Sequence, residues 1–278
     1  MSRALQRRTR FWLAPIVACA VATACPEQAG SVDAGSSDGP ALDAGLDAGA
    51  PRAALFNGAG IWAEGLTGLR DALSAAGFAT TEVSARGIQG GVLADHDLLV
   101  MGGGYAYDQW QDLGDAGITA IRDFVLGGGG YLGICAGTYL AADDVVWLGE
   151  PYPYPLNLFD GVADGPVDGL PAWPGNGWIK VNRNAGDHPL QGAGDVDVLY
   201  FGGPKFLPRD ITAVAPLLSY QGGAIAALAQ EAGAGRVVLS AVHPEITTAQ
   251  IGEDGGSGEV HDNRPLLASW ARWAVRRQ

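Results

Sequence analysis

The sequence predicts an α/β protein built on a mostly parallel sheet with helices on both faces. From residue 53 onward, short apolar runs alternate with amphipathic stretches, and several of the apolar runs lead into glycine turns. Of the 278 residues, 47% are hydrophobic and 17% are charged, which suffices for a large core. Because no second core is visible, we expect one domain over residues 53–278.

The first half of this domain reads as alternating strands and helices. The first strand enters a glycine turn at 57–60, the first helix ends at Gly77, and the third strand runs into Gly102–Gly104. Glycines at 127–130 end the second helix, and the next strand places Cys135 at its end. We expect strands at 53–56, 78–83, 98–101 and 131–134, and helices at 66–76 and 118–125.

The second half begins with a break in this pattern. Proline and aromatic residues between 143 and 200 predict an irregular insertion with short strands, in which Tyr152–Pro155 either rims the site or stiffens a loop. Regular elements then return, with strands expected at 199–201, 217–220, 224–229 and 236–242 and a closing helix through 266–273.

The amino-terminal end predicts export. Residues 1–24 combine a basic start with an apolar run too short to span a bilayer, which is typical of a signal peptide. Residues 22–25 fit ordinary signal cleavage and also resemble the lipobox of bacterial lipoproteins, with Cys25 as the acylated residue; we favour lipidation. Residues 25–52 repeat Asp-Ala-Gly three times and predict a disordered tether. We expect a protein held in the cell envelope by its lipid anchor alone.

Charge excludes several partners. The net charge is −13, and without the four arginines among the first ten residues 13 basic side chains face 30 acidic ones, a net charge of −17. Such a surface repels nucleic acid and anionic lipid. The glycine turns lack the phosphate-loop and dinucleotide fingerprints. We interpret His96, His188 and His261 as solvent-facing, because they lack the paired spacing of a zinc site. We therefore expect no cofactor and no metal.

Cys135 is the residue of greatest chemical interest. It lies between small residues, in Gly133-Ile134-Cys135-Ala136-Gly137, where a strand gives way to a helix, which is the pattern of a nucleophile elbow. A helix N-terminus stabilises a thiolate, and the Ala136 N–H, with Gly103 or Gly104 from the neighbouring strand end, can hold a developing oxyanion. The alternative interpretation of an isolated cysteine is a small, buried, inert residue.

His243 and Glu245 offer the base that a thiol nucleophile needs. His243 follows a predicted strand, and the carboxyl ends of strands in an α/β sheet meet in one crevice. Pro244 favours extended backbone, in which residues two apart point the same way, so Glu245 can contact the imidazole and orient it.

Four aromatic residues follow the glycine turn and the elbow. We consider two interpretations of them equally: a platform for substrate at the crevice, or core packing. They are Tyr105, Tyr107, Trp110 and Tyr139.

Taken in order, these motifs resemble the class I glutamine amidotransferase superfamily, and within it the N-terminal domain of eukaryotic biotin-protein ligases. The resemblance covers nearly all of residues 53–278 and implies a flavodoxin-like, doubly wound fold. It also implies Cys135 as nucleophile, His243 as base and Glu245 as the orienting carboxylate. The segments that carry it are Asn57–Gly60, Gly103–Gly104, Cys135–Tyr139, Phe201–Gly203 and His243–Glu245.

The expected activity differs from that of the family's larger members. The sequence contains neither a biotin-transferring domain nor a synthase domain to receive ammonia, so we expect neither of those reactions. Our leading hypothesis is a cysteine hydrolase that cleaves an amide or a small peptide through a thioester. The alternative is a non-catalytic module that binds a small metabolite or an envelope component in the same crevice.

Overall fold

The computed structural model describes residues 49–251 and 260–275. The predicted signal peptide, Cys25 and nearly all of the predicted tether lie outside these residues. The first strand begins at Arg52, one residue before the expected domain boundary. Within the described residues, no helix combines the length and apolarity that crossing a bilayer requires.

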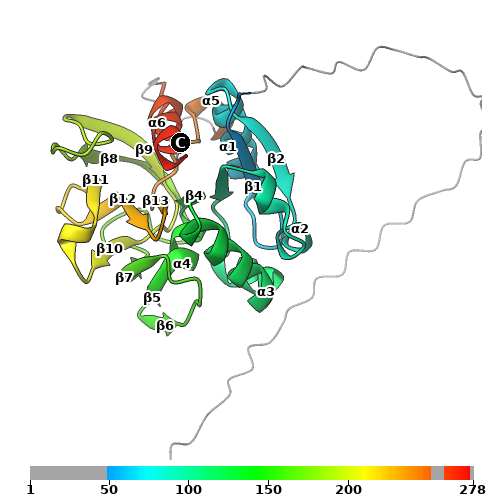
Figure 1. The fold of residues 1–278 in the computed structure, drawn as a ribbon. Helices are drawn as coiled ribbons and strands as arrows, with labels where there is room; N and C mark the ends of the chain where they lie inside the picture. Colours follow the sequence, from blue (N-terminus) through cyan, green and yellow to red (C-terminus); the bar gives the residue numbers. More distant parts are fainter. Residues whose placement is uncertain (1–48, 252–259, 276–278) are drawn as a thin grey trace, which may run out of the picture. The chain divides into compact units, whose positions relative to one another are not determined.

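Five parallel strands form the centre of the sheet. Their order is β2-β1-β3-β4-β13, and every adjacent pair runs parallel (Figure 1). This is the flavodoxin order, with the last strand drawn from far along the chain. All residues of β3 and β4 are buried, as expected where helices cover both faces. The bounds are β1 Arg52–Phe56, β2 Ala79–Val83, β3 Leu98–Met101, β4 Gly130–Ile134 and β13 Gly235–Ser240.

Helices cover the two faces of this central sheet. The step from β1 to β2 moves toward one edge and the step from β3 to β4 moves toward the other, so right-handed crossovers place α1 and α3 on opposite faces. Accordingly, α1 packs against α6, whereas α3 packs against α2 and α4. The bounds are α1 Ala63–Ala75, α2 Ala85–Gln89, α3 Ala106–Leu126, α4 Ala136–Ala141, α5 Thr248–Ile251 and α6 Arg264–Ala274, with short 3-10 turns at Val92–Asp95 and Ile211–Ala213.

Beyond β13 the sheet continues with mainly antiparallel pairing. The path runs β13-β12-β10-β7-β5-β6, and β11, β8 and β9 branch from β12 (Figure 1). Within the described residues, 13 strands share one sheet. The bounds are β5 Ala142–Trp147, β6 Glu150–Tyr152, β7 Phe159–Gly165, β8 Gly177–Arg183, β9 Asp195–Tyr200, β10 Lys205–Pro208, β11 Ala215–Tyr220 and β12 Ile225–Ala232.

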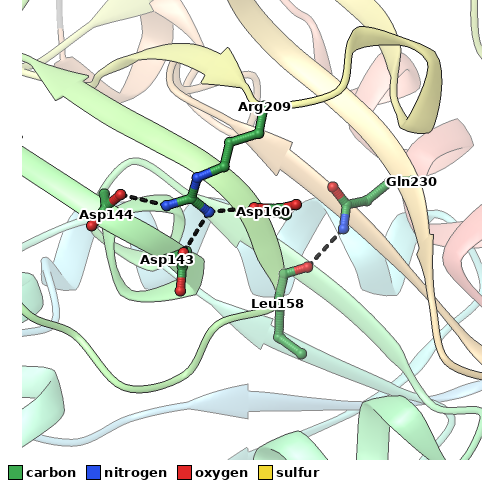
Figure 2. A network of polar contacts seen from close by, with 6 residues as sticks. All are labelled: Asp143, Asp144, Leu158, Asp160, Arg209 and Gln230. Carbon is green, nitrogen blue, oxygen red and sulfur yellow. Dashed lines mark hydrogen bonds and ion pairs between the residues drawn. The ribbon is translucent and has the colours of Figure 1, made fainter.

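Polar contacts join the strands of this second half. Arg209, just after β10, forms ion pairs with Asp143 and Asp144 of β5 and with Asp160 of β7 (Figure 2). Gln230 of β12 donates a hydrogen bond of 2.6 Å to the carbonyl of Leu158. Because the guanidinium is 44% exposed, the ion pairs fix the register of β5, β7 and β10 more than they stabilise the fold.

The α/β class is confirmed, and two elements differ from expectation. The segment 143–200, expected to be an irregular insertion with short strands, contributes β5 to β9 to the same sheet as the central strands, so the strands are present but the segment is not a separate insertion. The helix expected over 118–125 is the second half of α3, which begins at Ala106 and bends at Gly114, where φ is 56°. Its first half contains Tyr107, Asp108 and Asp112, which weaken an apolar helical pattern, so the sequence predicts only the more regular end.

Candidate functional site

Cys135 occupies a strained turn between β4 and α4. Its φ of 48° is uncommon for a residue with a side chain, and such strain persists only where the surroundings enforce it. Its N–H donates to the Ser240 carbonyl at 2.8 Å, and the Thr138 hydroxyl donates to its carbonyl at 2.6 Å. A β carbon at Gly137 would lie 2.2 Å from the Met101 carbonyl oxygen, so only glycine fits there. The backbone conformation is therefore that of the predicted elbow.

His243 lies just after β13, and both its backbone and its ring are held by polar contacts. Its N–H donates to the Leu199 carbonyl at 2.9 Å, which ties this segment to β9. Its ring nitrogen Nδ1 lies 2.7 Å from Oε1 of Glu245. Both side chains are almost completely buried, so solvent does not weaken the pair. The predicted contact between residues 243 and 245 is present.

The thiol and the imidazole approach the same point next to Gly103. An atom at the position of a Gly103 β carbon would lie 2.6 Å from Cε1 of His243 and 3.6 Å from Cβ of Cys135. The two side chains are therefore neighbours, although they lie 108 residues apart in the sequence. The thiol, in a residue that is 6% exposed, also lies 3.4 Å from the Phe201 carbonyl oxygen.

The surroundings of His243 favour the charged imidazolium. Burial lowers the pKa of His243, but the Glu245 carboxylate and the nearby Cys135 together outweigh it and raise that pKa from its usual 6.5 to about 10. Because the pKa is higher in the fold than in the unfolded chain, protonation of His243 adds stability that is complete below about pH 6.5 and is lost as the pH rises toward 10.

Replacing Glu245 with glutamine tests this balance. The Glu245→Gln variant keeps the side-chain size but removes the charge, so the largest effect that raises the pKa of His243 is lost and this pKa should fall. An NMR pH titration of the imidazole should show a largely protonated ring at about pH 8 in the wild type and a neutral ring in the variant. The same titration curve in both proteins would contradict this account of the site.

Helix α1 is shaped to cover Glu245. A β carbon at Gly68 would lie 2.7 Å from the Glu245 carbonyl oxygen, and one at Gly65 would lie 3.5 Å from its Oε1. Two glycines three positions apart thus form a small-residue face against which the carboxylate packs. Just before the helix, the Trp62 ring stands edge-to-face on the His243 ring at 5.1 Å. These contacts leave the imidazole little room to rotate.

The candidate oxyanion donors lie at the start of α4 and just after β3. Ala136 is the first residue of α4, so its N–H has no acceptor within the helix. Gly104 follows β3 and pairs with Ile61, and a β carbon there would lie 1.9 Å from the Gly60 carbonyl oxygen. The Gly103 carbonyl accepts a hydrogen bond from Trp62 N–H at 2.9 Å. The role of Ala136, Gly103 and Gly104 in holding an oxyanion stays a prediction.

Two adjoining cavities meet at Cys135. The first, here called the aromatic lobe, has a volume of about 180 Å³, and the second, the histidine lobe, about 280 Å³. They share walls formed by Gly104, Tyr105, Cys135, Trp173 and Phe201. The aromatic lobe is completed by Ala106, Tyr107, Tyr139, Val145, Trp147, Tyr152, Tyr154 and Gly202, and the histidine lobe by Ile61, Trp62, Ala63 and His243.

The predicted aromatic platform is only partly at the cavity. Tyr105, which is 60% exposed, lines both lobes, and Tyr107 lines the aromatic lobe. Tyr139 is 4% exposed and donates a hydrogen bond to the Gly202 carbonyl at 3.0 Å, so it is both core and wall. Trp110 lines neither lobe and packs against Tyr154.

Sequence reasoning missed several wall residues, among them Trp62, Trp147 and Trp173. Trp62 follows the first glycine turn and lies against His243, and Trp147 ends β5 in the segment interpreted as irregular. The sequence signal for Trp62 was its position next to a glycine turn, and the signal for Trp147 was its position at the end of an alternating apolar run. The sequence left open whether the segment with Tyr152 and Tyr154 rims the site or stiffens a loop. Both tyrosines line the aromatic lobe.

The three remaining histidines are half-buried and do not project freely into solvent. His188 packs against the ring of Trp273 and His261 against that of Trp178, with ring centres 4.8 and 4.6 Å apart. His96 Nδ1 lies 2.9 Å from the Val92 carbonyl oxygen. The expectation of solvent exposure was wrong because aromatic neighbours and a local turn cover these rings. Within the described residues, no three His, Cys, Asp or Glu side chains gather to hold a metal ion.

Comparison with known proteins identifies a family whose model matches most of the chain. A family model described as the N-terminal part of biotin-protein ligase matches residues 55–268. No curated protein matches the chain.

Solved structures share the fold. The structure is similar to that of a glutamine amidotransferase, with a TM-score of 0.55 and 17% identity over 80% of this chain and 98% of that one. It is also similar to a cytoplasmic protein from Salmonella typhimurium LT2, with a TM-score of 0.51 and 14% identity over 81% of this chain and 100% of that one. At these identities the likeness shows the fold alone.

Proposed function

The chain belongs to the biotin-protein ligase N-terminal family, which here has a glutamine amidotransferase-like fold, and we propose that it hydrolyses amides or small peptides through Cys135. One observation supports this proposal most strongly: the cysteine in a strained turn lies next to a histidine whose Nδ1 is 2.7 Å from a buried carboxylate. An inert core cysteine needs neither the strain nor the paired histidine.

The first half of the reaction forms a thioester. His243 carries the proton of the Cys135 thiol in the resting site, and the sulfur attacks the carbonyl carbon of the amide. The carbonyl oxygen takes up the electron pair and becomes an oxyanion, which the N–H groups of Ala136 and of Gly103 or Gly104 stabilise. When this intermediate collapses, the carbon–nitrogen bond breaks, and the imidazolium gives its proton to the leaving amine.

The second half releases the acid. His243 removes a proton from a water molecule, whose oxygen attacks the thioester carbonyl, and the carbon–sulfur bond then breaks. The sulfur leaves without a proton and His243 keeps the one taken from water, which restores the resting site, so the net reaction converts an amide and water into a carboxylic acid and an amine. Throughout, Glu245 holds the imidazole in one tautomer and stabilises its charged form.

Intact-protein mass spectrometry tests the proposal. The full chain is mixed with a panel of primary amides and short N-acyl peptides, and the reaction is quenched in acid within seconds. We expect a mass increase equal to one acyl group, mapped to the peptide that contains Cys135, together with release of the amine.

The rival function gives a different result in the same experiment. A non-catalytic binding module would retain an amide on native size exclusion without releasing amine and without an adduct on Cys135. That outcome would overturn hydrolysis and leave the same two lobes as a binding site for a small molecule.

A further inference from the structure

We propose that the substrate carries an uncharged aromatic group on the acyl side of the scissile amide, and that the aromatic lobe holds this group. The inference rests on the proposed function, since it assigns the acyl half of an amide to one lobe and the amine half to the other. It excludes free glutamine as the preferred substrate.

The position of His243 determines which lobe takes which half. His243 lines the histidine lobe but not the aromatic lobe, whereas Cys135 lines both. The leaving amine must receive its proton from His243, so it belongs in the histidine lobe. The acyl group, which becomes bound to the sulfur, then extends from Cys135 into the aromatic lobe.

The wall of the aromatic lobe suits a flat apolar ring. Its rings contact one another largely edge-to-face: Trp147 lies 5.5 Å from Tyr139 and 5.4 Å from Trp173, at interplanar angles of 83° and 79°. Tyr152 and Tyr154 are stacked at 6.2 Å on the same wall. These aromatic side chains offer ring faces and edges to the ring of a substrate. Pairing between aromatic rings stabilises such a complex by more than the burial of apolar area alone.

The charge of the lobe argues against an amino-acid acyl group. Among the described residues that line the aromatic lobe, none has a charged side chain. Glutamine would bring an ammonium and a carboxylate into this lobe, and each would lose water without gaining an opposite charge. Two carboxylates act on wall residues from outside the lobe, Asp164 on Tyr139 and the exposed Asp108 on Tyr154, and Asp164 is paired with Lys205 at 2.8 Å. An uncharged aromatic ring enters the lobe without this loss of hydration, because it carries no ionic group.

Binding to a protein that cannot turn over tests the inference. Full-length Cys135→Ala is titrated with three probes, 3-phenylpropanamide, propanamide and glutamine, and dissociation constants are measured by calorimetry or ligand-observed NMR. We expect 3-phenylpropanamide to bind at least about tenfold more tightly than propanamide, since only it buries a phenyl ring, and glutamine to bind no better than propanamide.

Two substitutions locate the ring. Trp147 lines only the aromatic lobe and Trp62 only the histidine lobe, so Trp147→Ala should reduce the preference for the phenyl probe several-fold while Trp62→Ala leaves that ratio unchanged. Tyr107→Ala gives a second test on the aromatic lobe, because this side chain is 50% exposed and its loss leaves the core intact. Equal affinity for all three probes, tightest binding of glutamine, or an effect of Trp62→Ala alone would overturn the inference.

The two proposals fail in different ways. If the phenyl probe binds preferentially but no amide is hydrolysed, the aromatic lobe is the binding site and the proposed reaction is wrong. If the wild-type protein hydrolyses amides without preferring an aromatic acyl group, the reaction stands and the assignment of the lobe is wrong.

Discussion

The Cys135→Ala variant should fold normally and lose amide hydrolysis by at least about 10³-fold, because the sulfur forms the bond on which both halves of the reaction depend. Alanine keeps the β carbon, so the φ of 48° at this position is no more strained than before. The thiol is buried but small, and its removal should cost only about 1 kcal/mol of the free energy of unfolding. Hydrolysis is measured as amine release, and stability by denaturant unfolding.

The serine variant provides the matched control. Cys135→Ser keeps a hydroxyl where the thiol stood, and the Phe201 carbonyl that lies 3.4 Å from the sulfur can accept its hydrogen bond. A hydroxyl is a far poorer nucleophile without strong activation, so this variant should also be inactive while remaining folded. Full activity in Cys135→Ala would show that the strained turn serves packing alone.

Much of the central fold could be predicted because its strands are buried on both faces. Continuous apolar runs such as 98–101 and 131–134 leave little choice between strand and surface, and the glycines that follow them fix the turns. The sequence predicts the contact between His243 and Glu245 from extended backbone at Pro244, but the structure forms it in another way: residues 243–246 make a turn in which the Ile246 N–H donates to the His243 carbonyl at 3.3 Å.

The strands between residues 143 and 200 could be predicted only in part from local signals, whereas the sequence predicts β11 and β12 directly. Strand β7 alternates buried with exposed or half-exposed residues, whereas β8 buries only Val181, and both contain glycines and charges that ordinarily indicate loops. Their pairing depends on contacts made across long sequence distances, such as Arg209 with Asp143 and Asp160. The same holds for the walls of the site, where Trp147 reaches Cys135 only through the fold of β5 against β7.

The Gly103→Ala variant should lose activity by at least about 100-fold although it changes no group that reacts. Its β carbon would lie 2.6 Å from His243 Cε1, closer than two carbon atoms can approach, so the imidazole or the backbone must shift. The imidazole cannot move aside without losing contacts, because the centre of the Trp62 ring lies 5.1 Å from its own centre and Glu245 Oε1 lies 2.7 Å from Nδ1. A displacement of about 1 Å is enough for such a loss of rate.

Gly102→Ala separates this effect from a general cost of substituting the turn. There the nearest atom to a new β carbon is the end of the Leu69 side chain at 3.1 Å, which can rotate away, and His243 is not within contact. We expect Gly102→Ala to retain most of the activity and Gly103→Ala to show, by NMR, an altered titration of the His243 ring. If both variants lost activity equally, the turn would act through its backbone as a whole; if neither did, the imidazole would not have to stand where Gly103 leaves space for it.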